Sequence, residues 1–224
     1  MQSRNETAWR KSRKFGDVYG GRRWPKIANR IFNRAHSLAP PATGQETPIL
    51  IEENPSRDFF FPLSGAEALE TLKQLPPEQV AGITHLWLRR IKQSDYECKQ
   101  KALAEFICGS GVRLIVLYPW STDLLLRFGK RKPPSKRIKR FARWTEDLVY
   151  QDDGWVLRWT KEALRQFYLE DLLLHEVGHH VDYFTRHWTL ANHKQLEGFA
   201  EQYAVFWSRD LKQVFDSQAN EDVS

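Results

Sequence analysis

Two histidines and a glutamate lie close together in the segment DLLLHEVGHHVD, residues 171–182. His175 and His179 are four residues apart, so on an α-helix both imidazoles lie on one face, one turn apart. Imidazoles placed in this way can hold one metal ion from the same side. Glu176 lies only about 60° around the helix from His179, so it can reach a water on that ion without being a ligand. The spacing therefore predicts a metal site with an adjacent carboxylate base.

The chemistry that needs this arrangement is hydrolysis with Zn²⁺ as the cofactor. Zinc lowers the pKa of its water to about 7, and a nearby carboxylate can accept the proton and return it to a leaving amine. We therefore expect Glu176 to be catalytic in the hydrolysis of a peptide or protein substrate. Gly178, inside the same segment, costs about 1 kcal/mol relative to alanine in a helix. This cost predicts that another backbone approaches the helix there.

A zinc site needs at least a third protein ligand, and the stretch EGFAEQYA at residues 197–204 offers two carboxylates. Glu197 and Glu201 are four residues apart on a second expected helix. Glu197 follows His179 by 18 residues, which is enough chain to turn back and lay this helix across the first.

The HExxH motif followed by GFAE resembles the zincin metallopeptidases of the gluzincin kind, and EGFAE is similar to the metal-binding helix of anthrax lethal factor-like peptidases. The resemblance covers about residues 155–210. It implies that Glu197 is the third metal ligand and that Glu201 accepts a hydrogen bond from the second ring nitrogen of a histidine. It also implies that residues 155–159 form an edge strand that binds extended peptides.

His193 is an alternative third ligand, 14 residues after His179. A three-histidine site resembles the Spartan-type proteases that digest DNA–protein crosslinks. The paired spacing of Glu197 and Glu201 favours Glu197, because it accounts for two residues at once. A non-catalytic, metal-stabilised module that binds nucleic acid or protein would use the same ligands without needing Glu176.

Several neighbouring side chains are candidates for supporting roles. Asp182 is expected one turn beyond His179 on the same face, where it could contact a ligand. His180 points away from His175 and is expected at the surface. Three more side chains are candidates to stabilise an oxyanion: Tyr183, His187 and Tyr203.

The elements that must position these residues predict an α+β, zincin-like fold: a small mixed sheet, an active-site helix and a following ligand-bearing helix. Apolar runs and turn residues predict strands at 48–51, 83–91 and 112–118, and a hairpin with strands 148–150 and 155–159. Periodicity and capping residues predict helices at 64–75, 95–108, 135–145, 160–187 and 193–214. Opposite His175 and His179, the helix 160–187 should bury an apolar stripe that ends at Phe184.

The charge is concentrated in two segments of a chain whose total is +6. Residues 1–40 carry ten Lys and Arg against two acids, and residues 127–143 carry nine and no acid. The remainder sums to 6 − 8 − 9 = −11. We expect a basic, flexible tail at 1–47, a domain at 48–214 with a basic insertion at 127–143, and a C-terminal tail at 215–224. The basic segments could bind nucleic acid or an acidic partner, or simply be solvated.

Three absences limit where the chain is expected to work. It has no apolar run of about 18 residues, so no membrane span is expected. The first 40 residues lack the apolar core of a secretory signal. The two cysteines, Cys98 and Cys108, are too few for a disulfide framework. A cytoplasmic location is the expectation.

Overall fold

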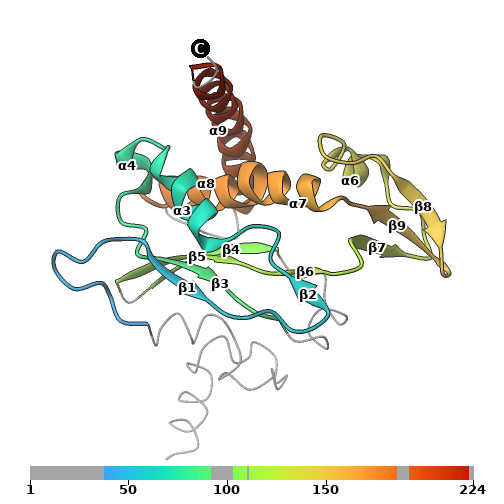
Figure 1. The fold of residues 1–224 in the computed structure, drawn as a ribbon, viewed down its shortest axis with the longest axis horizontal. Coiled ribbons are helices and arrows are strands. Elements are labelled where there is room, and N and C mark those ends of the chain that lie inside the picture. The colour runs from blue at the N-terminus through green and yellow to red at the C-terminus, as the bar shows by residue number, and fades with distance from the viewer. Residues whose placement is uncertain (1–37, 92–102, 110, 186–191, 222–224) are drawn as a thin grey trace, which may run out of the picture.

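The computed structural model describes residues 38–91, 103–109, 111–185 and 192–221, and it is a mixed structure of helices and small sheets. Helices cover one face of the largest sheet, and a three-stranded sheet lies at one end of the molecule (Figure 1). This arrangement confirms the predicted α+β class. No helix in the described part of the chain combines the length and apolar character needed to cross a bilayer.

The largest sheet has four strands, in the order β1 (Ile49–Glu52), β3 (His85–Leu88), β5 (Val112–Leu117) and β4 (Ala104–Gly109). The first three are parallel and β4 is antiparallel to β5, so the sheet is mixed as expected. All four residues of β3 are buried. The strand predicted at 83–91 is therefore present but shorter, and it is buried throughout because a central parallel strand is covered on both faces.

Strand β4 corrects the helix predicted at 95–108. Residues 104–109 pair in register with β5, from Ala104 opposite Leu117 to Gly109 opposite Val112. A tight turn joins β4 to β5, and in it Gly111 has a φ of +77° that suits glycine. Pairing with the neighbouring strand has overridden the local helical pattern. The part of the predicted helix before residue 103 lies outside the described residues.

The three-stranded antiparallel sheet has the order β7 (Leu125–Gly129), β9 (Gly154–Arg158) and β8 (Leu148–Gln151). Its β8–β9 hairpin confirms the sequence prediction. The turn consists of Asp152 and Asp153, with φ values of 47° and 64°, as in the two-residue loops that match strand twist.

The basic segment 127–143 is partly incorporated into this part of the fold. It begins inside β7 and contains the short helix α6 (Ser135–Lys139), which is shorter than the helix predicted at 135–145. The remaining strands, β2 (Phe59–Phe60) and β6 (Trp120–Ser121), form a small antiparallel pair.

Helix α3 (Gly65–Lys73) confirms the helix predicted after Ser64, and α4 (Pro77–Val80) follows it. A capping box begins α3: the Ser64 hydroxyl accepts from the Glu67 backbone N–H, and the Glu67 carboxylate accepts from the Ser64 backbone N–H. This reciprocal pair satisfies donors that the first helical turn would otherwise leave open.

The predicted helix 160–187 is a run of three helical pieces along one face of the four-stranded sheet (Figure 1). The α7 helix (Lys161–Phe167) leads into a π-helical turn, η2 (Tyr168–Leu173), and then into α8 (Leu174–Tyr183). The buried Tyr168 hydroxyl donates a 2.7 Å hydrogen bond to the Tyr118 carbonyl. This bond ties the π segment to the end of β5.

Helix α9 (His193–Glu221) runs seven residues past the predicted end at Val214. Most of the segment 215–224, expected to be a tail, is therefore helical. The helix contacts α8 at Gly178, where an added Cβ would lie 2.9 Å from the Ala200 Cα and 3.0 Å from the Tyr203 Cβ. The predicted close approach at Gly178 is thus present.

The main core lies between the sheet and these helices. Its fully buried members include Leu72, Leu86, Ile115, Leu117, Trp120, Leu157, Tyr168 and Leu173.

Candidate metal centre

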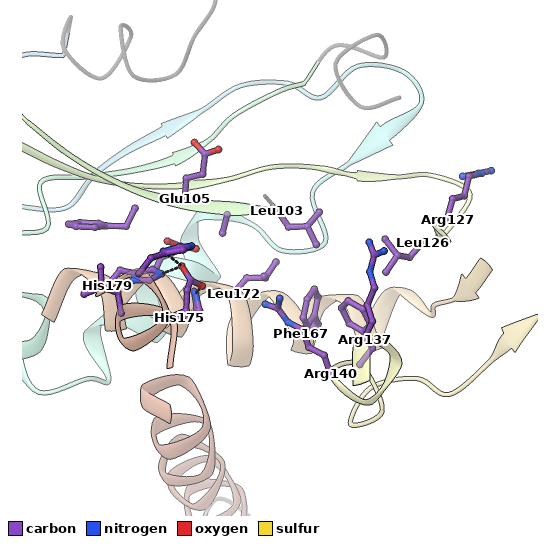
Figure 2. Close-up of a pocket in the computed structure, with 17 residues that line it drawn as sticks. Leu103, Glu105, Leu126, Arg127, Arg137, Arg140, Phe167, Leu172, His175 and His179 are labelled. Atoms are coloured by element: carbon purple, nitrogen blue, oxygen red, sulfur yellow. Dashed lines mark ion pairs between the residues drawn. The ribbon is translucent and has the colours of Figure 1, made fainter. Parts of the chain in front are cut away.

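His175 and His179 on α8 and Glu197 on α9 come together at the packed face of the two helices. The Nε2 of His175 lies 3.5 Å from one Glu197 carboxylate oxygen, and the Nε2 of His179 lies 3.6 Å from the other. The three ligand atoms all lie within 4.8 Å of one another. The Nε2 atoms of both imidazoles face the Glu197 carboxylate, and dashed lines at His175 and His179 mark these ion pairs in Figure 2. The two helices therefore converge on one point.

These separations suit a bound cation better than direct hydrogen bonds. An N–H···O bond spans about 2.7–3.2 Å, which is shorter than either distance. Two atoms that each lie about 2.1 Å from a tetrahedral ion are about 3.4 Å apart. Two imidazole nitrogens and a carboxylate oxygen are donors that zinc accepts. The residues present therefore fit a metal ion held between α8 and α9.

Burial prepares the two histidines for this role. His175 is 8% exposed and His179 is 9% exposed. Burial, followed by the charges of His179 and Arg140, lowers the pKa of His175 to about 3. Burial also lowers the pKa of His179, although the charges of Glu197 and Asp182 oppose that shift. Both rings are therefore neutral at pH 7, which is the form that binds a metal.

Glu176 lies beside the three ligands and is 6% exposed. Burial raises the pKa of its carboxyl to about 8, and a hydrogen bond from the Phe106 backbone N–H opposes the rise. Glu176 lines the same cavity as His175 and His179. A buried carboxyl group that faces a cavity and is oriented by a backbone donor has the placement of a general base. With this raised pKa it is mostly protonated at pH 7, and a cation held by the three ligands would lower its pKa and so favour the carboxylate.

Phe106 belongs to β4, the edge strand of the four-stranded sheet. The Leu103 carbonyl accepts from the Tyr118 N–H on the β5 side. Because hydrogen-bonded and non-hydrogen-bonded pairs alternate in an antiparallel ladder, the backbone N–H and C=O groups of Glu105 and Ile107 also face β5. Ala104 and Phe106 then present their backbone groups to the other edge of β4, with which no strand of the described residues pairs. Glu176 meets Phe106 at this edge. Strand β9, the edge strand expected from the resemblance, is instead the centre of its own sheet. That expectation was wrong.

Comparisons with protein-family models, with curated proteins and with solved structures found no match. What the site does must therefore be argued from its geometry.

The cavity beside the ligands has a volume of about 550 Å³. Its floor follows the helical run from His179 and His175 past Leu172 to Phe167, as Figure 2 shows. Beyond Phe167 the cavity is lined by Arg127 of β7 and Arg137 of α6. The cavity is therefore an elongated groove with the ligands at one end.

The other candidate ligand and the two candidate supporting acids occupy different places. His193 lines the cavity, with its Nδ1 3.7 Å from a Glu197 oxygen, but it is not a member of the three-residue cluster. Asp182 is buried and near enough for its charge to raise the pKa of His179. Glu201 is exposed. The Nδ1 of His175 has no hydrogen-bond partner among the described residues. The hydrogen bond that Glu201 was expected to accept from a histidine is therefore not made by this ring.

The remaining candidates lie away from the ligands. His180, expected at the surface, is 1% exposed, and its Nε2 donates to the Ala81 carbonyl at 3.1 Å. The prediction erred because α4 covers that face of α8. Neither Tyr183 nor Tyr203 lines the cavity, and His187 lies outside the described residues. Phe184, expected to be buried, is 57% exposed, since the helix has ended one residue before it.

Sequence reasoning missed the part of the site that lies on other elements. Glu105 and Phe106 were assigned to a helix, and Arg137 and Arg140 were considered only as charges of a basic segment, not as part of the site. All four line the cavity. No local spacing relates these residues to the HExxH segment, so only the tertiary structure brings them to it.

Proposed function

We propose that this chain is a zinc-dependent peptidase of the zincin type, acting on peptide or protein substrates. The observation that supports it best is the Glu197 carboxylate, which lies 3.5 and 3.6 Å from the two histidine Nε2 atoms while the buried Glu176 lies beside them. A structural metal site would gain nothing from a buried carboxylate that faces the cavity.

In this proposal His175, His179 and Glu197 hold the ion. Zinc, when bound, supplies Lewis acidity and makes a water acidic enough to attack at neutral pH. Glu176 accepts the proton of the attacking water and can return it to the amine that leaves. The Phe106 N–H orients the Glu176 carboxylate for this transfer, so β4 positions the base as well as forming the cavity wall.

The free edge of β4 gives the substrate a place to lie. An extended peptide can add to an exposed strand through backbone hydrogen bonds, which are independent of its side chains. Ala104 and Phe106 line the cavity, and the alternation of the ladder turns their backbone groups toward it. The Phe106 N–H already donates to Glu176, so a peptide would pair with the backbone groups of Ala104. A peptide on this edge would pass beside Glu176 and the three ligands.

The deciding experiment compares the full-length protein with its Glu176→Gln variant. Glutamine keeps the size and the hydrogen-bond acceptor of glutamate but does not take up a proton. We expect both proteins to bind one zinc per chain, measured by metal analysis, and only the wild type to cleave a peptide library. The loss should be about 10²–10⁴-fold, the usual contribution of a general base.

Two results would count against the proposal. Equal cleavage by the variant would remove Glu176 from the mechanism. Zinc binding by both proteins with no cleavage by either would instead indicate a metal-stabilised binding module. His175→Ala serves as the reference for loss of metal, because it removes a ligand and leaves Glu176 in place.

A further inference from the structure

The part of the groove that leads away from the metal ligands carries three arginines: Arg127, Arg137 and Arg140. Arg127 lies in β7, Arg137 belongs to α6, and Arg140 directly follows that helix. In Figure 2 Arg137 and Arg127 lie beyond Phe167 as seen from the histidines, whereas the Arg140 side chain reaches back to the space between Phe167 and Leu172. The acidic lining residues, Glu105, Glu176 and Glu197, contact or neighbour the ligand end instead.

The arginines differ in how far the protein neutralises them. Arg127 pairs with Asp123 at 2.6 Å, and Arg140 reaches Asp171 at 3.8 Å, which is a long contact. Arg137 stacks on the Phe128 ring, with its guanidinium carbon 5.0 Å from the ring centre. Among the described residues, no carboxylate lies within ion-pairing distance of Arg137. This part of the groove therefore has positive charge in excess.

The walls between the charges are apolar and lower the local dielectric. Leu126, Phe141, Phe167 and Leu172 line this stretch. Phe141 and Phe167 pack edge to face, with ring centres 5.9 Å apart. A guanidinium next to such walls attracts a carboxylate more strongly than it would in open water, and its planar donors match a carboxylate in two-point contact.

The position along the groove follows from helix geometry. Asp171, the partner of Arg140, precedes His175 by four residues and Phe167 precedes it by eight. At about 1.5 Å per residue, these positions lie about 6 and 12 Å along the helical run from the ligands. An extended peptide advances about 3.3 Å per residue. The arginines therefore lie about two to four substrate residues from the metal site.

We infer that Arg137 and Arg140 form a specificity subsite for an aspartate or glutamate side chain of the substrate, two to four residues from the bond that is cut. The inference rests on the proposed peptidase function. It also gives a role to the basic segment 127–143, part of which lines the groove. A nucleic acid on the same arginines is the competing occupant, and the apolar walls argue against it.

The test uses zinc-loaded, full-length Glu176→Gln protein and fluorescein-labelled eight-residue alanine-rich peptides. Each set carries a single Glu, Gln or Lys at successive positions, and binding is followed by anisotropy. We expect the Glu peptide to bind about tenfold more tightly than the Gln peptide at one or two positions, equivalent to about 1.4 kcal/mol. At those positions Arg137→Glu should reverse the order and favour Lys.

The matched control is Lys136→Glu, which makes the same charge change on the same helix at a side chain that does not line the cavity. It should keep the preference for Glu. Equal effects of the two variants would show a general charge effect and overturn the subsite. If a single-stranded oligonucleotide displaces no peptide, the result supports the subsite. If the oligonucleotide displaces the peptide, and Arg137→Glu weakens oligonucleotide binding but leaves peptide binding unchanged, the subsite is overturned.

The two proposals fail in different ways. Cleavage by the wild-type protein without any preference for Glu would refute the subsite and leave the peptidase. Discrimination between Glu and Gln peptides without any cleavage would refute the peptidase and leave an anion-reading groove.

Discussion

Replacing Gly178 by alanine tests whether the packing of α8 against α9 sets the geometry of the metal site. The new Cβ would lie 2.9 Å from the Ala200 Cα and 3.0 Å from the Tyr203 Cβ. Ordinary carbon contacts are about 3.5–4.0 Å, so the helices must separate by about 0.5–1 Å. Overpacking of this kind costs about 1–3 kcal/mol, and the better helix propensity of alanine returns about 1 kcal/mol. The net destabilisation expected is about 0–2 kcal/mol.

We expect Gly178→Ala to change zinc affinity more clearly than it changes stability. Glu197 lies one turn before Ala200 on the helix that must move. A shift of about 0.5–1 Å would widen the 3.5 and 3.6 Å separations beyond what a tetrahedral ion spans, about 3.4 Å. We expect zinc affinity to fall at least tenfold. Competition with a chromophoric chelator would measure the affinity, and denaturant unfolding of the metal-free protein would measure the stability.

Gly198 is the matched control. It lies in α9 next to Glu197, and an added Cβ would meet nothing within 4 Å. Gly198→Ala should therefore stabilise the protein by up to about 1 kcal/mol and leave zinc affinity unchanged. If Gly178→Ala bound zinc as tightly as Gly198→Ala and gained as much stability, the close approach would not control the site.

Two further predictions concern single side chains. Glu197→Ala should weaken zinc binding far more than His193→Ala in the same chelator competition; the reverse order would move the third ligand to His193. A hydrogen bond from the Ser64 backbone N–H, together with Arg165, lowers the pKa of the Glu67 carboxyl in the folded protein. The Glu67 carboxylate therefore stabilises the fold fully above its unfolded pKa near 4.3, and this stabilisation is lost as the pH falls through its folded pKa. Because the carboxylate is partly exposed, Glu67→Gln should cost about 0.5–1 kcal/mol at pH 7 and about zero near pH 2; a cost that does not change with pH would refute this assignment.

The elements that sequence reasoning predicted are those specified by neighbouring residues. The Ser64–Glu67 box specifies the start of α3, and the run Val112–Leu117 reads as a buried strand without further information. His175, Glu176 and His179 carry their geometry in their spacing on one helix. For the same reason Gly178 gave a usable signal: an unfavourable residue inside a helix needs a neighbour, and α9 is that neighbour.

The elements that it missed depend on partners outside their own segment of the chain. Residues 104–109 have no strong strand pattern, and their conformation follows from pairing with β5. Arg127 belongs to a strand only because β9 lies beside it. Phe106 reaches Glu176 across two elements that lie far apart in the sequence. The residues that line the groove could therefore not be predicted from the sequence, whereas the three candidate ligands could.

The open edge of β4 has a consequence for the protein at high concentration. An edge strand that accepts any extended backbone also accepts the edge of another copy of the chain. Two molecules joined in this way would each cover the other's Glu176. Solutions of the protein should then lose specific activity reversibly as they are concentrated, and dilution should restore it. Under the proposed function, the edge that would take up the substrate backbone would thus also limit how crowded the protein can be while it works.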